Sequence, residues 1–450
     1  MKVYDAAAIR NVALVGHGGC GKTQLVSAML FASGAVNRLG KVDEGSTVTD
    51  FDDEEIARKH TLSSSLAYAE WQKTKINIID TPGFANFLSD AKAALHVVEG
   101  AIVCVDAVAG VEVQTEKLWA EAAALNLPRI VSVNRLERER ASLERTLESL
   151  RRDCAREIIP IQLPLGEERG FTGVVDLVSM KALTFATDGS GKTSEGDVPA
   201  ALADRAAKAR EELIEMVAEA DEQLMEKFFS EGTLTQDELA QGLRAATQAG
   251  KIFPLVCTSG LHTIAVQPLL DTIVTYVPSP ADRPFPAVTD SGDPTTVKAT
   301  DSGPYIAFVW KTIADPFAGR ITMLRVVSGT LKQDSNVHNQ TRDMTERFGH
   351  LLALQGKTQT QVPELKAGDL GAVAKLKDTR TSDVLAEKTT KVKIADIKFP
   401  EPVLAYAIEP KSRGDEDKIS GSMSRLKEED PSISYQRDPQ THELLLAGQG

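Results

Sequence analysis

The sequence predicts an α/β domain with a largely parallel sheet, interrupted by an α+β insertion and followed by a β-barrel and a partial α+β domain. From residue 9 to about residue 134, short apolar runs such as "NVALVG", "INIID" and "AIVCVDAV" alternate with helix-like stretches, as in a sheet covered on both faces. After "PSPADRPFP", short alternating strands separated by glycine-rich turns are typical of a β-barrel. Near Phe399 the pattern becomes strand, helix, strand, strand.

These pattern changes divide the sequence into four segments. We expect the α/β domain at residues 1–155 and 251–283, the insertion at 156–250, the β-barrel at 284–396 and the partial α+β domain at 397–450. Within the insertion, residues 156–184 are strand-like and residues 200–229 have the pattern of a charged amphipathic helix. The segment "TDGSGKTSEGDVPA" between them is expected to be a loop, and "TQDELAQGL" starts a further helix with a capping box.

The composition limits the classes of function. A chain of 450 residues with 42% hydrophobic content can bury several cores. Its net charge of -13 and pI of about 5.2 argue against a surface built to coat nucleic acid, and leave a local basic patch open. The four cysteines lack metal-ligand spacing, which favours reduced thiols. No apolar run approaches the ~18 residues of a membrane span, so we expect a cytoplasmic protein.

The stretch "GHGGCGKT", residues 16–23, has the form GxxxxGK[ST] between a predicted strand and a predicted helix. Its glycines let the backbone curl so that successive N–H groups face a phosphate. Lys22 can neutralise the β- and γ-phosphates, and Thr23 can ligate Mg²⁺. The alternative is a chance glycine-rich turn. The expected nucleotide-binding residues here are Gly16, His17, Gly18, Gly19, Cys20, Gly21, Lys22, Thr23 and Gln24.

The stretch "IIDTPG" ends the next apolar strand of this kind. Asp80 can hold the Mg²⁺ shell through water, and the Gly83 N–H can bond to the terminal phosphate. A lone DTPG would usually be a turn at the end of a strand. Its position one strand-helix-strand unit after the phosphate loop favours a nucleotide site instead.

Two further strand ends, "VNRLE" and "CTSG", carry the residue types needed to select a base. Asn134 can bond to the base, while the Glu137 carboxylate pairs with the N1 and N2 hydrogens of guanine, a donor pair that adenine lacks. A charge-rich helix start is the alternative. The residues that we expect around the base are Asn134, Arg135, Glu137, Thr258, Ser259 and Gly260.

These motifs, in this order and with an insertion before the last one, resemble the translational GTPases, and most closely the elongation factor G family. "VDAVAGVEVQTEKLW", "AGKIFPLVCTSG" and "PEPVLAYAIEPKSRGDEDKISGSMSRLKEEDP" look like that family's segments, and the resemblance runs from near Arg10 to Gly450. It implies an α/β P-loop GTPase domain with an α+β insertion, a β-barrel domain and a partial ferredoxin-like α+β domain. It also implies GTP or GDP and Mg²⁺ as cofactors.

The resemblance assigns roles to individual residues. It implies that "GSTVTDFDDEEIARKHTLSSS" is the first switch, in which Thr61 closes onto Mg²⁺ when GTP is bound. Thr23, Thr61 and Asp80 are then the metal ligands, and Lys22, Thr61 and Gly83 act in catalysis.

The sequence departs from the family at the two motifs that surround the nucleotide. Gly19 stands where an Asp is common, which removes a charge near the phosphates. The usual Asn-Lys-x-Asp reads Asn134, Arg135, Leu136, Glu137, and the longer Glu137 must shift to keep both hydrogen bonds short. Arg135 keeps a cation but has a planar fork. We expect a preference for guanine with some loss of affinity.

The switches depart from the family as well. Arg58, Lys59 and His60 replace the usual Arg-Gly-Ile before Thr61. Phe84 stands where the family has a histidine that orients the attacking water, and it has neither a donor nor an acceptor. Two interpretations stay open: Phe84 is an ordinary apolar residue at the start of the switch helix, or hydrolysis is slow or depends on groups from the ribosome.

The resemblance implies a monomeric GTPase that binds ribosomal RNA and ribosomal proteins, avoids membranes, and drives or regulates translocation or recycling. A ribosomal RNA contact on the barrel would use Lys311, Arg320, Arg325 and Lys332. The alternatives are a nucleotide-gated ribosome-binding protein with weak or no hydrolysis, a release-factor-type GTPase, and a P-loop ATPase or small-molecule kinase. Because elongation factor G continues beyond "LLLAGQG", we expect a chain truncated within its third domain.

Overall fold

The computed structural model describes residues 2–186, 190–315, 319–412 and 415–450. Its contacts divide the chain into two compact units. The first, which we call the nucleotide unit, comprises residues 10–83 and 98–278. The second, the barrel unit, comprises residues 1–9, 84–97 and 279–450.

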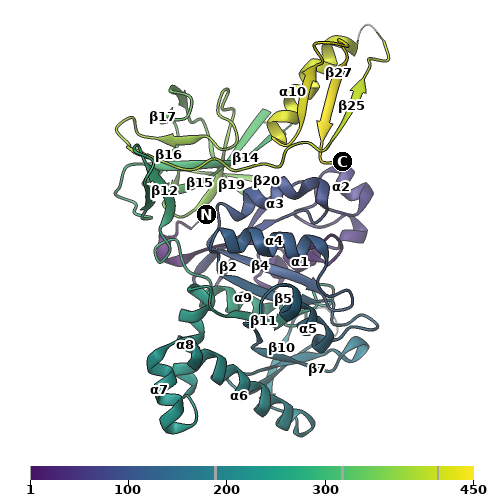
Figure 1. The fold of residues 1–450 in the computed structure, drawn as a ribbon, viewed down its shortest axis with the longest axis vertical. Coiled ribbons are helices and arrows are strands. Elements are labelled where there is room, and N and C mark those ends of the chain that lie inside the picture. Colours follow the sequence, from purple (N-terminus) through teal and green to yellow (C-terminus); the bar gives the residue numbers. More distant parts are fainter. Residues whose placement is uncertain (1, 187–189, 316–318, 413–414) are drawn as a thin grey trace. The chain divides into compact units, whose positions relative to one another are not determined.

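A seven-stranded sheet forms the centre of the nucleotide unit (Figure 1). In spatial order its strands are β2 (Ser65–Trp71), β3 (Thr74–Asp80), β1 (Ile9–Val15), β4 (Gly100–Asp106), β5 (Arg129–Asn134), β11 (Phe253–Cys257) and β6 (Ile158–Pro160). β1 pairs with β4, β4 with β5, β5 with β11 and β11 with β6 in parallel. Every residue of β1, β3 and β4 is buried, as expected for strands covered on both faces.

Outside the insertion, four α-helices in the described part of this unit lie between these strands in the sequence and a fifth follows β11: α1 (Lys22–Ala32), α2 (Asp53–Arg58), α4 (Val113–Ala124), α5 (Leu143–Asp153) and, after β11, α9 (Val266–Tyr276). Two elements of the first switch segment were not predicted, α2 and the start of β2. Asp52 starts α2 as a capping box with Glu55. β2 pairs antiparallel with β3 over its whole length, and its apolar residues Leu66, Ala67 and Ala69 are buried.

The described residues of the insertion form a four-stranded antiparallel sheet and three α-helices, which Figure 1 shows together. Its elements are β7 (Gln162–Leu165), β8 (Gly173–Asp176), β9 (Lys181–Phe185), β10 (Thr193–Asp197), α6 (Ala203–Glu219), α7 (Glu222–Glu231) and α8 (Gln236–Gln248). β6, at the start of the predicted insertion, instead pairs in the main sheet.

Two predictions for the insertion were wrong. The expected loop after β9 contains β10, whose five exposed residues pair with β9; the first residues of that loop, 187–189, lie outside the described part. Because all residues of β10 are exposed, its sequence lacks the alternation of apolar and polar residues that identifies a strand. The single helix expected at 200–229 is interrupted, because the Asp221 side chain accepts bonds from the backbone N–H groups of Gln223 and Leu224 and starts a new helix there.

The barrel unit is rich in strands, which confirms the predicted β domain after the α/β domain. Its strands are β12 (Phe285–Thr289), β13 (Pro294–Val297), β14 (Ile306–Asp315), β15 (Gly319–Ser328), β16 (Thr330–Lys332), β17 (Asn336–Asn339), β18 (Met344–Arg347), β19 (Leu351–Gln355), β20 (Thr358–Val362), β21 (Glu364–Lys366), β22 (Leu370–Ala374), β23 (Val384–Ala386) and β24 (Val392–Lys393). Eight of them form one sheet in the order β18-β17-β23-β14-β15-β22-β19-β20. Buried Phe308, Trp310 and Phe348 fill its core.

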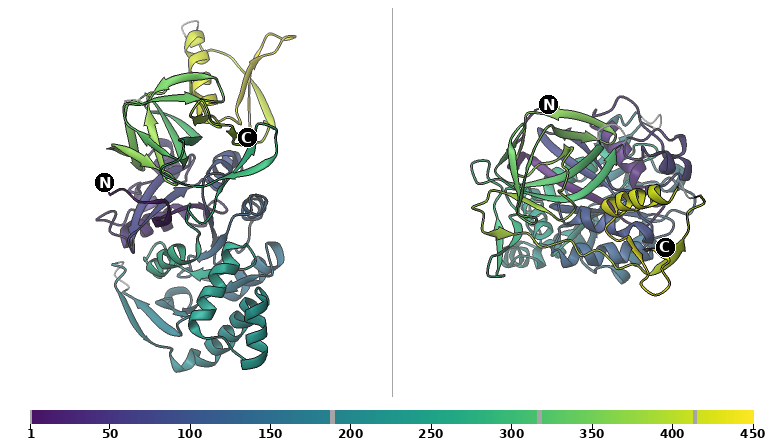
Figure 2. Two further views of the ribbon diagram at one scale, coloured as in Figure 1. Left: turned by 90° about the vertical axis from the view of Figure 1, so that its left-hand side faces the viewer. Right: turned by 90° about the horizontal axis from the view of Figure 1, so that it is seen from above.

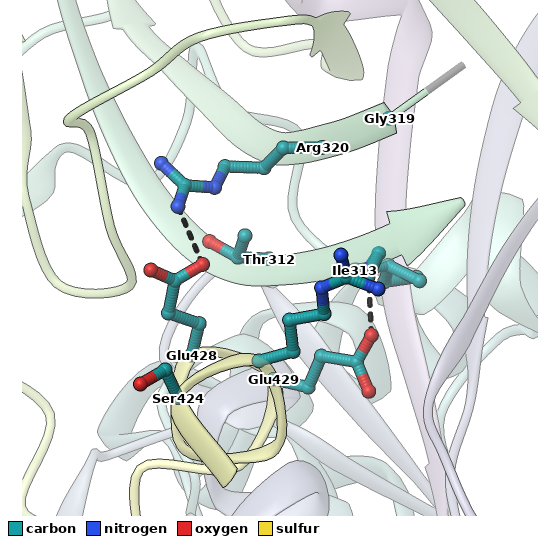
Figure 3. A pocket seen from close by; sticks show the side chains of 9 residues that line it. Thr312, Ile313, Gly319, Arg320, Ser424, Glu428 and Glu429 are labelled. Carbon is teal, nitrogen blue, oxygen red and sulfur yellow. Dashed lines mark hydrogen bonds and ion pairs between the residues drawn. The ribbon is translucent and has the colours of Figure 1, made fainter. Parts of the chain in front are cut away.

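The last part of the barrel unit is a three-stranded antiparallel sheet with one helix beside it (Figure 2). The strands are β25 (Leu404–Ile408), β27 (Leu444–Gly448) and β26 (Ser434–Arg437), and the helix is α10 (Glu416–Glu429). α10 also contacts the barrel strands. Arg320 of β15 pairs with Glu428 (Figure 3). The Glu429 carboxylate accepts from the Ala314 N–H at 2.7 Å.

Two buried cations of the barrel strands hold helix α3 (Leu88–Leu95), which belongs to the same unit. Lys311 of β14 pairs with Asp90 in the first turn of α3. Arg325 of β15 donates to the Val97 carbonyl just beyond the helix, at 3.1 Å. Because Lys311 and Arg325 are 4% and 2% exposed, the expectation that both contact RNA was wrong; Lys332 is exposed, and Arg320 is engaged by Glu428.

Candidate nucleotide-binding site

The loop between β1 and α1 depends on glycine at three positions. Gly16, Gly19 and Gly21 have φ values of 145°, 87° and 89°, which residues with a Cβ rarely adopt. A Cβ on Gly16 would also clash with the carbonyl oxygen of Cys104 in β4. The loop leads into the N-terminus of α1, where unpaired N–H groups and the helix dipole favour an anion. The backbone therefore has the form of a phosphate cradle.

Lys22 lies inside this loop and is 5% exposed. Its ammonium group donates to the carbonyls of Gly16 at 3.0 Å and His17 at 2.9 Å. Gly83 packs against the same place, because a Cβ added to it would clash with the Lys22 ammonium and the Gly18 backbone. The structure thus brings the predicted lysine and the predicted phosphate sensor together at the loop.

Five oxygen-bearing side chains lie close together beside Lys22. The hydroxyls of Thr23 and Thr61 are 2.8 Å apart, and the Thr61 hydroxyl donates to Asp50 at 2.7 Å. Thr49 donates to Asp80 at 2.7 Å. Burial raises the pKa of Asp50 to about 7 and that of Asp80 to about 6. The three residues predicted as metal ligands are therefore neighbours, and Asp50 joins them.

This cluster fits the Mg²⁺ that the fold family implies. Among the described residues, one buried oxygen of Asp50 and one of Asp80 have no hydrogen-bond partner. Two hydroxyls and two carboxylates are the hard oxygen donors that Mg²⁺ prefers, with the rest of its shell left to water and phosphate. No group of three or more His, Cys, Asp and Glu side chains within the described ranges could hold a metal. The phosphates of a bound nucleotide would complete the coordination of a cation at this cluster.

Asn134, at the end of β5, contacts two loops. One is the phosphate loop, residues 16–23, and the other is the loop after β11, residues 258–260. Its side-chain amide donates to the Cys20 carbonyl at 3.0 Å and to the Gly21 carbonyl at 3.3 Å. Its side-chain oxygen accepts from the Thr258 hydroxyl at 3.3 Å and from the Gly260 N–H at 3.1 Å. One buried side chain therefore holds both loops in place.

The other predicted base-site residues surround Asn134. One oxygen of Glu137 is buried without a hydrogen-bond partner in the described part of the chain. Arg135 lies next to Gly21 and pairs with Asp106 at the end of β4. The Ser259 hydroxyl accepts from the His262 N–H at 3.3 Å and shapes the second loop. An orphan carboxylate oxygen is what a guanine-reading acid would present before the base arrives.

Three predicted residues have their side chains engaged within the protein. His17 faces Glu112, with 3.5 Å between Nε2 and Oε1, and its Nδ1 accepts from the Gln114 N–H at 3.4 Å. Gln24 donates to the carbonyl of Gly40 at 3.0 Å. Cys20 is buried; a hydrogen bond from Cys104, with the Lys22 charge adding to it, lowers the Cys20 pKa to about 6. These side chains shape the loop, while backbone groups remain to meet a ligand.

Sequence reasoning missed three acidic residues of the site. Asp50 lies in the middle of a charged switch segment, which gave no reason to single it out. Glu55 is buried and accepts from the backbone N–H groups of Leu62 and Ser63, so it holds the segment that follows Thr61. Burial raises the Glu55 pKa to about 7. The end of β4, "VCVD", was a strand-end signal of the kind that found Asp80, and it would have found Asp106.

Phe84 is the first residue of the barrel unit's second segment and the N-cap of a short 3₁₀ helix, Ala85–Phe87. Its side chain is 41% exposed. Both interpretations of Phe84 stay predictions.

Comparison with known proteins adds family evidence to this geometry. The family model described as elongation factor Tu GTP binding domain matches residues 7–279, which is more than half of the chain. The models for elongation factor G domain 2 and elongation factor G domain III match residues 304–388 and 399–450.

Among solved structures, the chain is similar to ttk003000868 from Thermus thermophilus, with 34% sequence identity and a TM-score of 0.88. The match covers 99% of this chain and 64% of that one. No described helix is both long enough and apolar enough to span a bilayer. Because the first of these family models covers more than half of the chain, the protein belongs to the elongation factor Tu GTP binding domain family, and its later segments match domains 2 and III of elongation factor G.

Proposed function

We propose that this chain binds GTP with Mg²⁺, hydrolyses it to GDP and phosphate, and uses the two nucleotide states to drive or regulate a step on the ribosome, either translocation or recycling. The observation that carries the proposal is the group formed by Lys22, Thr23, Thr61 and Asp80 beside the glycine loop. The matched elongation factor G domains support the ribosome as partner.

In this proposal each residue acts on the triphosphate. Lys22 stabilises negative charge on the β- and γ-phosphates, and the N–H of Gly83 bonds to the γ-phosphate. Thr23, Thr61, Asp50 and Asp80 would hold Mg²⁺, which, when bound, supplies positive charge to the phosphate oxygens. Hydrolysis removes the γ-phosphate, and with it the contacts that hold Thr61 and Gly83 in the GTP state. Both switch segments then change conformation.

Phe84 supports a second candidate, a nucleotide-gated ribosome-binding protein with little hydrolysis, because this side chain cannot orient a water molecule. The two candidates differ in one measurement, GTP turnover with and without 70S ribosomes. For the GTPase we expect stimulation of at least roughly tenfold, since the ribosome would complete the catalytic arrangement. Reactions with ATP in place of GTP serve as the control. A rate that ribosomes leave unchanged would contradict hydrolysis as the function.

The base site gives a separate prediction. Replacing Glu137 with Asp is expected to tighten GDP binding by about fivefold, because the shorter carboxylate can reach both guanine donors without a shift. Calorimetry with GDP and with ADP measures it. Glu139→Asp, an exposed acid two residues on, is the matched control and should change neither affinity. Equal affinities for GDP and ADP in the unaltered protein would remove the guanine assignment.

A further inference from the structure

The two carboxylate oxygens of Asp106 accept hydrogen bonds from different groups. Asp106 is 5% exposed at the carboxyl end of β4, directly beside Asn134 at the end of β5. Oδ1 accepts from the backbone N–H groups of Val108 at 2.8 Å and Ala109 at 3.3 Å, and so fixes the turn after β4. Oδ2 accepts from two guanidinium groups, Arg135 at 3.1 Å and Arg138 at 3.2 Å. The turn and the ion pairs therefore use different atoms.

Arg135 occupies a strained and crowded position. Its φ of 65° lies in the left-handed region, which residues with a side chain rarely adopt. Its side chain runs over the phosphate loop, where a Cβ added to Gly21 would lie 3.1 Å from the Arg135 Nε and 2.7 Å from the Asn134 side-chain nitrogen. The Arg135 side chain therefore lies against the phosphate loop at Gly21.

We propose that Asp106 is a positioning residue that fixes the Arg135 guanidinium against the phosphate loop at Gly21, and thereby lengthens the time for which a guanine nucleotide stays bound. The inference rests on the proposed function. A flexible arginine, 33% exposed, would lose side-chain entropy each time it packed against the nucleotide. The ion pair with a buried carboxylate orders Arg135 before the nucleotide arrives.

Arg138 provides an internal comparison. Its guanidinium bonds to the same Oδ2 atom, and its backbone N–H bonds to the Arg135 carbonyl at 3.0 Å. Its side chain is 52% exposed, and it makes no hydrogen bond or ion pair with the phosphate loop among the described residues. Asp106 should therefore act on nucleotide binding through Arg135 and not through Arg138.

Because the two oxygens of Asp106 have different partners, one substitution can remove the ion pairs and keep the turn after β4. Asp106→Asn keeps a carbonyl oxygen for the Val108 and Ala109 N–H groups, and replaces Oδ2 with an amide that cannot accept from a guanidinium. The test follows release of a fluorescent N-methylanthraniloyl GDP from the full chain after mixing with excess GDP. It uses Asp106→Asn, Arg135→Ala, the double variant and Arg138→Ala, with the thermal midpoint of each nucleotide-free protein.

We expect Asp106→Asn and Arg135→Ala each to speed release on the order of tenfold, since each removes the charge-assisted contact between Asp106 and Arg135. The double variant should match the single ones, Arg138→Ala should change release by less than about twofold, and the thermal midpoints should agree. Unchanged release from Asp106→Asn, or effects that multiply in the double variant, would overturn the inference. Release of the ADP analogue from the unaltered protein at the same rate as GDP would instead reject the guanine site itself.

Discussion

Replacing Lys22 with methionine is expected to lower affinity for GTP about a hundredfold or more. The substitution removes a cation that faces the phosphates and also the two bonds that hold the Gly16 and His17 carbonyls, so the loop loses both charge and shape. Methionine keeps most of the side-chain volume, which separates these effects from a packing defect. Equilibrium titration with a fluorescent GTP analogue measures the change.

The matched control for this substitution is Lys117→Met on the exposed face of α4, which should leave GTP affinity unaltered. The circular dichroism spectra and thermal midpoints of both variants should match those of the unaltered chain. If Lys22→Met binds GTP as well as the control does, Lys22 does not contact the phosphates and the assignment of the glycine loop is wrong.

The second large effect is expected at Phe84. Phe84→His should raise ribosome-stimulated GTP hydrolysis by about a hundredfold, because a positioned imidazole can orient and polarise the attacking water. GDP affinity should hardly change, since the substitution adds no contact to the diphosphate. Single-turnover hydrolysis with saturating 70S ribosomes is the measurement.

Phe84→Leu is the control for this experiment, because leucine is apolar like phenylalanine and has no hydrogen-bonding group. It should keep the rate of the unaltered chain. An unchanged rate in Phe84→His, with ribosome binding verified by co-sedimentation, would show that catalysis here does not use this position. Phe84 would then be an ordinary apolar residue at the start of the switch helix.

The parts of the site that the sequence predicts are those with a local signal. The glycine positions with left-handed φ, the lysine after them and the residues at the ends of apolar strands all follow from short patterns, because sheet topology brings strand ends together. Lys22, Thr23, Asp80, Gly83 and Asn134 were found in this way. Their arrangement in the structure agrees with a single nucleotide site, and their chemical roles stay predictions.

The parts that the sequence did not predict depend on distant partners. Asp50 joins the cluster because Thr61 and Asp80 are folded against it, and a charged switch segment gives no sign of that burial. Lys311 and Arg325 had the appearance of surface cations on strands. Whether such a residue is buried depends on its partner, and Asp90 lies 221 residues from Lys311 in the sequence.

The position of α3 decides how this protein can be exchanged with its relatives in chimeras. A cut at residue 279 would separate Asp90 and Val97 from Lys311 and Arg325, although all four belong to one compact unit. A buried charge left without its partner costs several kcal/mol, on the order of 3–5. A chimera that moves these barrel strands into a relative must therefore move residues 84–97 as well. A chimera that keeps residues 84–97 of this protein needs a barrel with both cations, at the positions of Lys311 and Arg325. The exchangeable module of this factor is discontinuous in sequence.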